Sequence, residues 1–258
     1  MKLQDKNLYF VGGVVRDEIL EIKSFDTDYC YEGNAIEFSK NLNVTQSNPD
    51  FGTVRIDNCI DIASTRKEIY PKPGHLPVIT EIGCSIKDDL KRRDFTINAM
   101  AKNTLTGELF DYYGGMEDLK AKKLRVLHVN SFIDDPTRIV RGLKFSVRFG
   151  FELDENTKNL QDDYLKNINY DMSYFRLKKE LKETFNLKND KAYELFIEQG
   201  IYKLLGKNQP EKDSLKIQIN KEQNEPWLMY LSQFNLDNLP LSNSEKKELL
   251  KYRLSNSY

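Results

Sequence analysis

A short apolar run that ends in a glycine pair constrains this 258-residue chain most strongly. Leu8–Val11 predicts a buried strand and Val14–Leu20 predicts a helix, so Gly12 and Gly13 fall at the bend between them. Glycine lets a backbone approach a ligand closely, and a helix N-terminus favours anions. The pattern therefore predicts an α/β segment that can hold phosphates, with Arg16 one turn into the helix. A simple tight turn is the alternative interpretation.

A second feature is a pair of carboxylates in the strand-like stretch Phe25–Tyr31. Because side chains alternate along a strand, Asp26 and Asp28 are expected on the same face. Two carboxylates on one face can hold divalent cations, which activate an attacking hydroxyl and stabilise a leaving pyrophosphate. Asp61, in the alternating stretch Cys59–Ala63, is a third candidate acid, either as a base or as a metal neighbour. An ordinary strand-edge role for Asp61 is the alternative.

The stretch Lys91–Met100 combines two cations with an acceptor. It predicts a helix that begins at Asp94, in which Asn98 lies on the same face because it follows four residues later. Arg93 could neutralise a phosphate, and Asp94 could accept a hydrogen bond from a ribose hydroxyl. The alternative is a helix-start aspartate flanked by solvated arginines.

A third polar pattern lies in the second half of the chain, where Asp135 is predicted to cap a helix that has Pro136 at its first position. The helix is predicted to run to about Phe149 and to stop at Gly150. Four side chains recur every three residues along it, namely Asp135, Arg138, Arg141 and Lys144. Aspartate accepts and arginine donates hydrogen bonds, so this row could read the polar edge of a base. A solvated surface row is the alternative.

Composition limits the class of protein. The net charge is -1, which does not by itself indicate a nucleic-acid partner, but Lys120–Arg148 holds eight basic and two acidic residues, a local net charge of +6. The three cysteines have no CxxC spacing, which favours a reducing compartment over a disulfide framework or zinc ribbon. No apolar run reaches membrane-spanning length, so we expect a cytoplasmic protein without a membrane partner.

The order of elements predicts an α+β chain. Strands Phe51–Ile56 and Cys59–Ala63 are expected to pair, and the polar, proline-containing stretch Thr65–Cys84 is predicted to be a mobile or irregular loop. From about Asp118 the pattern becomes helical. Further helices are predicted over Glu155–Asn169, Tyr174–Asn186, Lys191–Leu205 and Glu245–Arg253, with a polar connection over Gly206–Asn224.

Taken together, four motifs resemble the class II tRNA nucleotidyltransferase (CCA-adding enzyme) and bacterial poly(A) polymerase family. In family order they are Gly12–Asp17, Asp26–Asp28, Arg92–Met100 and Asp134–Arg141, and the likeness covers roughly residues 8–205. The resemblance implies a polymerase-beta-like nucleotidyltransferase head, a mixed sheet with helices, followed by an all-helical neck and body. It implies a head at residues 1–118, a nucleotide-recognition region at 119–205, and a short helical C-terminal region, a reduced tail, at 206–258.

Members of this family add CMP and AMP from CTP and ATP to RNA 3′ ends without a template. Carried over, the resemblance implies that Asp26 and Asp28 hold Mg²⁺. Asp61, from its place in the alternating stretch alone, is the third catalytic candidate. The candidate nucleotide-binding residues are Gly12, Gly13, Arg16, Arg93, Asp94, Asn98, Asp135, Arg138, Arg141 and Lys144.

The sequence departs from the family pattern at Lys144, where an arginine is usual, and at Asp134, where glutamate is frequent. The expected activity is CCA addition to the tRNA 3′ end, because the stretch Thr65–Cys84 is similar to the segment that the family needs for AMP addition. An A-adding enzyme or a poly(A) polymerase is the alternative. A catalytically inactive RNA- or nucleotide-binding module is the alternative from another class, against which the intact carboxylate pair argues. With a short tail, weak RNA binding is expected, which a homodimer would offset with a second basic surface.

Overall fold

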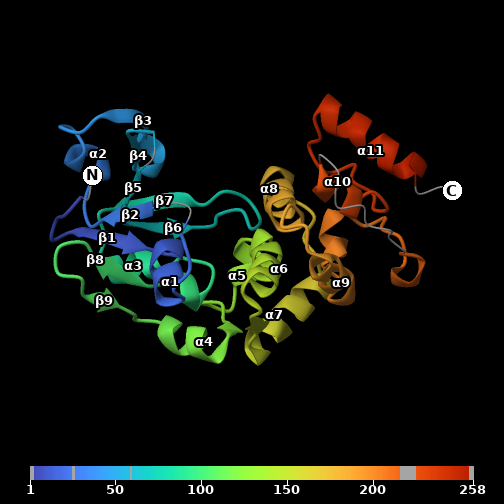
Figure 1. Ribbon diagram of the computed structural model, residues 1–258, viewed down its shortest axis with the longest axis horizontal. Coiled ribbons are helices and arrows are strands. Elements are labelled where there is room, and N and C mark those ends of the chain that lie inside the picture. The colour runs from blue at the N-terminus through green and yellow to red at the C-terminus, as the bar shows by residue number, and fades with distance from the viewer. Residues whose placement is uncertain (1–2, 25–26, 59, 216–224, 256–258) are drawn as a thin grey trace. The chain divides into compact units, whose positions relative to one another are not determined.

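The computed structural model describes residues 3–24, 27–58, 60–215 and 225–255, and it divides into two compact units (Figure 1). The first comprises residues up to Pro71 together with Pro77–His128, and the second comprises Lys72–Leu76 together with all residues from Val129. The division therefore falls ten residues after the expected position 118, and residues beyond 205 belong to the second unit. None of the helices in the described ranges is long and apolar enough to cross a membrane.

A seven-stranded mixed sheet forms the centre of the first unit (Figure 1). In sheet order the strands are β3 Val44–Asn48, β4 Thr53–Ile56, β5 Ile60–Ser64, β2 Thr27–Tyr31, β1 Leu8–Val11, β8 Ala101–Asn103 and β9 Leu109–Phe110. The pair β2 and β5 is parallel, and the other neighbours are antiparallel. The expected mixed sheet is thus confirmed, as is the pairing of β4 with β5, which is antiparallel.

Alternation along the strands sends side chains into two separate hydrophobic clusters. Leu8 belongs to one cluster, whereas Tyr9 and Val11 belong to the other, as expected for a central strand covered on both faces. On β2, Tyr29 joins the cluster of Leu8, and Cys30 joins that of Val11. The helices of this unit are α1 Gly13–Ile19, α2 Ala35–Phe38, α3 Ile86–Lys91 and α4 Gly115–Ala121, with 3-10 turns η1 Pro49–Phe51 and η2 Thr96–Asn98 and the short strand β10 Lys123–Leu124.

The prediction of an irregular loop over Thr65–Cys84 is wrong. This stretch contains β6 Arg66–Ile69 and β7 Val78–Ile82, which pair antiparallel and form a two-stranded sheet of their own. The prolines lie in the connection between the strands. β6 is almost entirely polar, so it lacks the apolar alternation that identifies a strand in a sequence.

The prediction of a helix that begins at Asp94 is also wrong. The α-helix precedes this point: α3 starts after Ser85, whose hydroxyl accepts a hydrogen bond from the backbone N–H of Asp88, and it ends at Lys91. Only the turn η2 follows. The Asp94 carboxylate accepts hydrogen bonds from the backbone N–H of Phe95 and from the Asn98 side chain, and such local bonds compete with helix formation.

The second unit is built almost entirely from helices. They are α5 Ser131–Asp134, α6 Thr137–Phe149, α7 Glu155–Lys166, α8 Tyr174–Phe185, α9 Asp190–Glu198, α10 Pro226–Tyr230 and α11 Asn243–Ser255, with turns η3 Ile201–Leu205 and η4 Lys212–Ser214 and the short strand β11 Glu152–Leu153. Gly150 ends α6 with φ 71°, as predicted. Gly200, with φ 70°, interrupts the single helix that was predicted over Lys191–Leu205.

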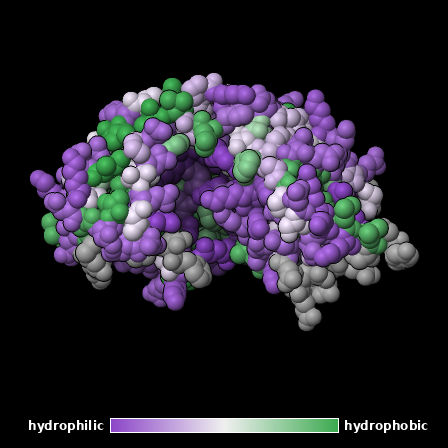
Figure 2. All heavy atoms as spheres, turned by 90° about the horizontal axis from the view of Figure 1, so that it is seen from above, coloured by the Kyte–Doolittle hydropathy of each residue, from purple (hydrophilic) through white to green (hydrophobic). Residues whose placement is uncertain are grey.

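The C-terminal residues complete this helical core. Trp227 of α10 is fully buried, and Tyr230 stacks on Phe185 of α8 with ring centroids 5.2 Å apart. α10 packs against both α8 and α11. The surface in Figure 2 is mostly hydrophilic, with hydrophobic residues in smaller groups.

Candidate active site

The parallel pairing of β2 with β5 brings two predicted carboxylates together. Asp28 and Asp61 lie opposite each other in the register of the two strands. Residues that flank them along the strands pack in the Leu8 cluster, so both carboxylates lie on the other face of the sheet, together with Val11 and Cys30. Both line a pocket of about 320 Å³, to which Arg93 also contributes. Asp26 lies outside the described residues. The shared face predicted for Asp26 and Asp28 therefore stays a prediction, whereas the strand of Asp61 does lie beside that of Asp28.

Asp61 is ion-paired with a neighbour on β4. Arg55 lies opposite Asp61 in the antiparallel register and donates from Nε to Oδ1 at 2.7 Å and from Nη2 to Oδ2 at 2.6 Å. Both side chains are about half exposed, so water screens the pair. Since both carboxylate oxygens accept from Arg55, Asp61 is in a poor position to act as a general base.

The donor chemistry at the pocket fits a hard divalent cation. Asp28 is exposed, and Asp28 and Asp61 supply the carboxylate oxygens that Mg²⁺ prefers. Within the ranges that the structure describes, no group of three or more acidic, histidine or cysteine side chains is arranged to hold a metal ion. Asp28, which is exposed and lines the pocket, could take part in binding Mg²⁺.

Cys30 lies two residues beyond Asp28 on the same face, but its chemistry differs. The thiol is completely buried, and burial raises its pKa well above the ordinary value. It is therefore a protonated packing residue rather than a nucleophile or metal ligand.

The turn at the glycine pair is adjacent to the Arg93 side chain. Gly12 has φ 65° and ψ -122°, a conformation that requires glycine, and a Cβ at this position would lie 2.9 Å from Nη1 of Arg93. The N–H of Gly12 donates to the backbone carbonyl of Met100. Gly12 thus allows Arg92–Asp94, the Arg-Arg-Asp segment, to approach the end of β1. Gly13 begins the seven-residue helix α1.

Three predicted nucleotide-binding residues form a buried chain of hydrogen bonds. Arg16 donates to the carboxylate of Asp17 and, through Nη1, to Oδ1 of Asn98. Asn98 in turn donates from Nδ2 to Oδ1 of Asp94 at 2.9 Å. All four side chains are buried. The structure therefore brings α1 and the Arg-Arg-Asp segment together through these residues.

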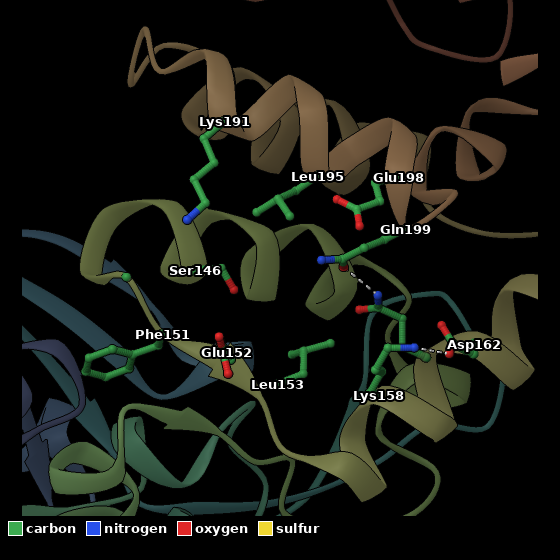
Figure 3. A pocket seen from close by; sticks show the side chains of 12 residues that line it. Ser146, Phe151, Glu152, Leu153, Lys158, Asp162, Lys191, Leu195, Glu198 and Gln199 are labelled. Carbon is green, nitrogen blue, oxygen red and sulfur yellow. Dashed lines mark hydrogen bonds and ion pairs between the residues drawn. The ribbon is translucent and has the colours of Figure 1, made fainter. Parts of the chain in front are cut away.

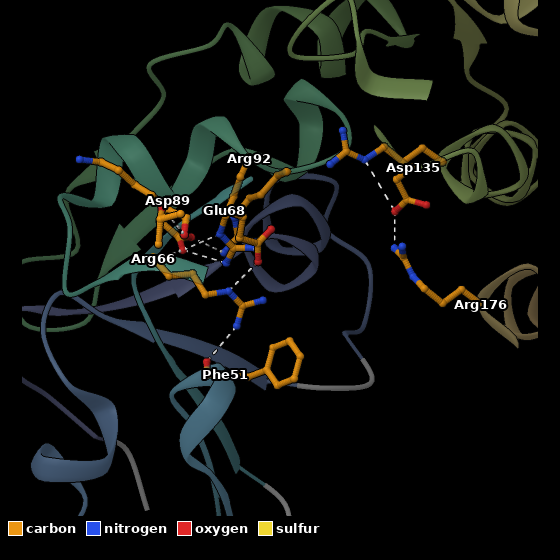
Figure 4. Close-up of polar contacts among 11 residues, drawn as sticks. Phe51, Arg66, Glu68, Asp89, Arg92, Asp135 and Arg176 are labelled. Carbon is orange, nitrogen blue, oxygen red and sulfur yellow. Dashed lines mark hydrogen bonds and ion pairs between the residues drawn. The ribbon is translucent and has the colours of Figure 1, made fainter. Parts of the chain in front are cut away.

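Arg93 belongs to a charged cluster that joins α3 to β6, and Figure 4 labels its other members, Arg66, Glu68, Asp89 and Arg92. Asp89 of α3 is fully buried and accepts hydrogen bonds from Arg92 and Arg93 and from the backbone N–H of Arg66. Glu68 of β6 accepts from Arg66 at 2.7 Å and from Arg92 at 3.1 Å. Burial alone would raise the pKa of Asp89, but the arginine charges and hydrogen bonds hold it below the ordinary value.

In the second unit, the start of α6 joins Asp135 to two arginines. One oxygen of Asp135 accepts from the backbone N–H and the hydroxyl of Thr137 at 3.1 and 2.6 Å. The other accepts from Arg176 of α8 and lies 4.0 Å from Nε of Arg138. Arg138 also donates to the Ser131 hydroxyl at 2.8 Å. Asp135 and Arg138 are buried, so their polar groups are held in defined orientations.

Arg141 and Lys144 are brought together by acidic residues of α8. Arg141 donates to Glu180 at 3.2 Å, and Lys144 donates to Glu180 at 2.8 Å and to Glu183 at 2.6 Å. These acceptors are the internal partners that such a row of charges requires when it is shielded from water.

A larger pocket of about 610 Å³ lies elsewhere in the second unit (Figure 3). Lys191 and Leu195 of α9 face Glu152 and Leu153 of β11 across it. Its lining contains none of the predicted site residues, so the smaller pocket, which is lined by Asp28, Asp61 and Arg93, is the better candidate active site.

Sequence reasoning missed several residues that contact predicted site residues, among them Arg55, Asp89, Arg176 and Glu180. Asp89 could have been found, because Arg92 and Arg93 follow it at the three- and four-residue spacings of helical ion pairs. The other three depend on strand register or on helix packing, which no local pattern indicates.

The sequence matches the family described as the Poly A polymerase head domain over residues 8–125. An A-adding tRNA nucleotidyltransferase from Aquifex aeolicus (strain VF5) is 46% identical over 164 residues, which are 59% of this chain and 20% of that relative. Across three A-adding relatives, the match spans only 19% to 38% of their lengths.

Two solved structures match this chain over a larger share of both lengths. A CCA-adding enzyme in its apo form II is 30% identical, with a TM-score of 0.81, and the match covers 96% of this chain and 67% of that chain. A tRNA nucleotidyltransferase complexed with a primer tRNA and an incoming ATP analog is 31% identical, with a TM-score of 0.69, and the match covers 95% and 75%. By its motifs, its fold and these relatives, the chain belongs to the class II tRNA nucleotidyltransferase and poly(A) polymerase family.

Proposed function

We propose that this protein adds CMP and AMP from CTP and ATP to the 3′ end of tRNA, without a nucleic-acid template. The observation that carries the proposal is the pocket in which Asp28 and Asp61 lie beside Arg93. Nucleotidyl transfer requires charge neutralisation and positioning more than covalent chemistry, and this pocket offers both. The solved relative that holds a primer tRNA and an ATP analog supports the same substrates.

Asp28, with Asp26, would hold Mg²⁺ in a two-metal arrangement, and Arg93 would bind the phosphates of the incoming nucleotide. The metal would supply Lewis-acid activation of the attacking hydroxyl and stabilisation of the leaving pyrophosphate. Because Asp61 is paired with Arg55, it would act as a charged neighbour of Asp28 rather than as a base.

Asp135 and Arg138 would select the base. Asp135 offers carboxylate oxygens that accept from an exocyclic amino group, and Arg138 offers donors for ring nitrogens or carbonyls. Both are buried and fixed by neighbouring groups, which favours discrimination because they would meet a base in one defined orientation. Arg141 and Lys144 would support this pair through α8.

The second candidate function is A-addition alone, to tRNA that already ends in CC. The 46% identical Aquifex aeolicus relative, an A-adding enzyme, favours it. Both candidates use the same pocket, so they differ only in which triphosphates and primers are accepted.

Incubating the protein with tRNA lacking its 3′ end, with tRNA ending in CC, and with CTP and ATP singly and together distinguishes the candidates. CCA addition predicts a three-nucleotide extension when both triphosphates are present, whereas A-addition predicts one AMP on the CC-ending primer only. Long adenosine tails would indicate a poly(A) polymerase. If nucleotide binds but no primer is extended, while an active relative extends it in parallel, the protein is a binding module and the proposal fails.

A further inference from the structure

We infer that Asp89 is the positioning residue for Arg93, and that it sets where the pocket holds the phosphates of its ligand. The inference rests on the proposed nucleotide site, but Asp89 belongs to none of the four motifs and does not line the pocket. It acts through Arg93 and is not itself a catalytic residue.

The first observation is that the two carboxylate oxygens of Asp89 accept hydrogen bonds from different partners. Oδ1 accepts from Nε and Nη2 of Arg92, at 3.0 and 2.8 Å, and from the backbone N–H of Arg66 at 3.1 Å. Oδ2 accepts from Nη2 of Arg93 at 3.1 Å. Three contacts fix the orientation of the carboxylate on one side, so the oxygen that faces Arg93 is held in place.

The second observation is that Arg93 depends on this contact. Among the described residues, Asp89 is the only hydrogen-bond partner of its guanidinium, and Nε of Arg93 is buried without one. On its other side, Nη1 lies against Gly12, whose missing Cβ leaves the space that the guanidinium occupies. Without Asp89, no other described contact would keep the guanidinium aimed into the pocket.

The third observation is the charge balance of the cluster. Arg66, Arg92 and Arg93 carry three positive charges, while Glu68 and Asp89 carry two negative charges. Glu68 bonds Arg66 and Arg92, and Asp89 bonds Arg92 and Arg93, so the cluster carries one excess positive charge that the three arginines share. Because Arg93 is the member of the cluster that lines the pocket, it presents positive charge in a fixed orientation to an anionic ligand.

A double-mutant cycle between Asp89→Asn and Arg93→Lys tests this coupling. The readouts are kcat and KM for nucleotide incorporation, the affinity for inorganic tripolyphosphate by calorimetry, and the thermal unfolding midpoint. Glu68→Gln is the matched control, because it removes one buried negative charge from the same cluster without touching Arg93. If Asp89→Asn fails to fold, Asp89→Glu is used in the cycle instead, because glutamate keeps the negative charge but displaces it.

We expect Asp89→Asn to lower kcat by about tenfold or more, because misdirected reacting groups lose rate steeply. KM should change less, since the attraction between the arginines and the phosphates persists. In the Arg93→Lys background, the same change should alter kcat and tripolyphosphate affinity less than about twofold, whereas Glu68→Gln should have equal effects in both backgrounds.

Equal effects of Asp89→Asn with and without Arg93, or wild-type kinetics and tripolyphosphate binding in Arg93→Lys, would overturn the inference. If the wild-type protein extends no primer, the proposed function fails, and the cycle is then decided by tripolyphosphate binding alone. If Asp89→Asn then lowers tripolyphosphate affinity equally in the wild-type and Arg93→Lys backgrounds, the inference fails whether or not the protein is an enzyme.

Discussion

Replacing Gly12 with alanine tests the geometry of the candidate site most directly. Gly12 has φ 65°, and the added Cβ would meet Nη1 of Arg93 at 2.9 Å and the backbone carbonyl of Asn98 at 3.7 Å. The substitution therefore introduces backbone strain and a steric contact with the pocket arginine at the same time.

The two effects have different magnitudes and different readouts. A non-glycine residue in such a conformation costs about 1–3 kcal/mol, and since each kcal/mol lowers the unfolding midpoint of a domain of this size by about 2–4 °C, we expect a fall of roughly 2–12 °C. To restore an ordinary contact of 3.4 Å, the guanidinium must move by the difference, 0.5 Å. Because a 1 Å misplacement can cost about 100-fold in rate, this shift predicts about a tenfold loss of kcat.

Gly107→Ala is the matched control. Gly107 also has a positive φ, 74°, but a Cβ there would meet nothing within 4 Å. It should lower the unfolding midpoint by a similar amount while leaving kcat near the wild-type value. Incorporation of labelled nucleotide into tRNA is measured at a temperature where both variants are fully folded.

The steric argument fails if Gly12→Ala retains wild-type kcat, or if both glycine variants lose kcat equally. The first result would mean that Arg93 moves without consequence. The second would mean that any backbone strain in this unit impairs the reaction, whatever lies beside the pocket.

Four further predictions follow from contacts in the two units. Asp28→Asn should reduce incorporation by more than about 100-fold, through loss of metal neutralisation, while leaving the thermal midpoint unchanged, because the side chain is exposed; near-wild-type turnover would refute the metal assignment. Arg176→Ala removes a donor to the proposed base-reading carboxylate, so it should alter the ratio of kcat/KM among the four triphosphates, whereas an equal loss for all four would indicate a structural role. Asp89 has a lowered pKa, so its contribution to stability is complete above the ordinary carboxyl range and is lost as pH falls through that pKa; urea unfolding between pH 5 and pH 2 should show a steeper loss for wild type than for Asp89→Asn. RNA binding should weaken steeply with salt, and Lys179→Ala should reduce the slope of log affinity against log salt by about one. Lys178→Ala should not, because Lys178 is 17% exposed and lies 2.6 Å from Glu245, whereas Lys179 is 75% exposed and lies 4.0 Å from Glu183.

Local patterns in the sequence predicted the elements that local forces determine. The apolar run of β1, the glycine turn and the helix α6 ending at Gly150 all occur where expected, because strand alternation, positive φ and helix termination each depend on a few neighbouring residues. α6 begins at Thr137, one residue later than predicted, although Asp135 still accepts a hydrogen bond from the Thr137 backbone N–H.

The features that sequence reasoning could not supply depend on distant residues. Arg141 and Glu180 are 39 positions apart, and Arg16 and Asn98 are 82 apart, so no spacing rule connects them. The hairpin of β6 and β7 was missed for a related reason. Its polar residue Glu68 is shielded from water by an ion network with α3, rather than by an apolar face of the kind that alternation reveals.

The site residues carried over from the family motifs fall into two groups with different consequences. Arg16, Asn98 and Asp94 already bond one another in the buried interior, and removing one would leave a buried polar partner unsatisfied. Asp28 and Arg93, in contrast, line the pocket, where in the proposed function they would face opposite charges on a metal-bound triphosphate. The first group should therefore act mainly on the stability and closure of the site, and the second on the reaction itself. Arg55 affects the pocket without belonging to either group. It bonds both carboxylate oxygens of Asp61, so any cation that approaches Asp61 must compete with its guanidinium.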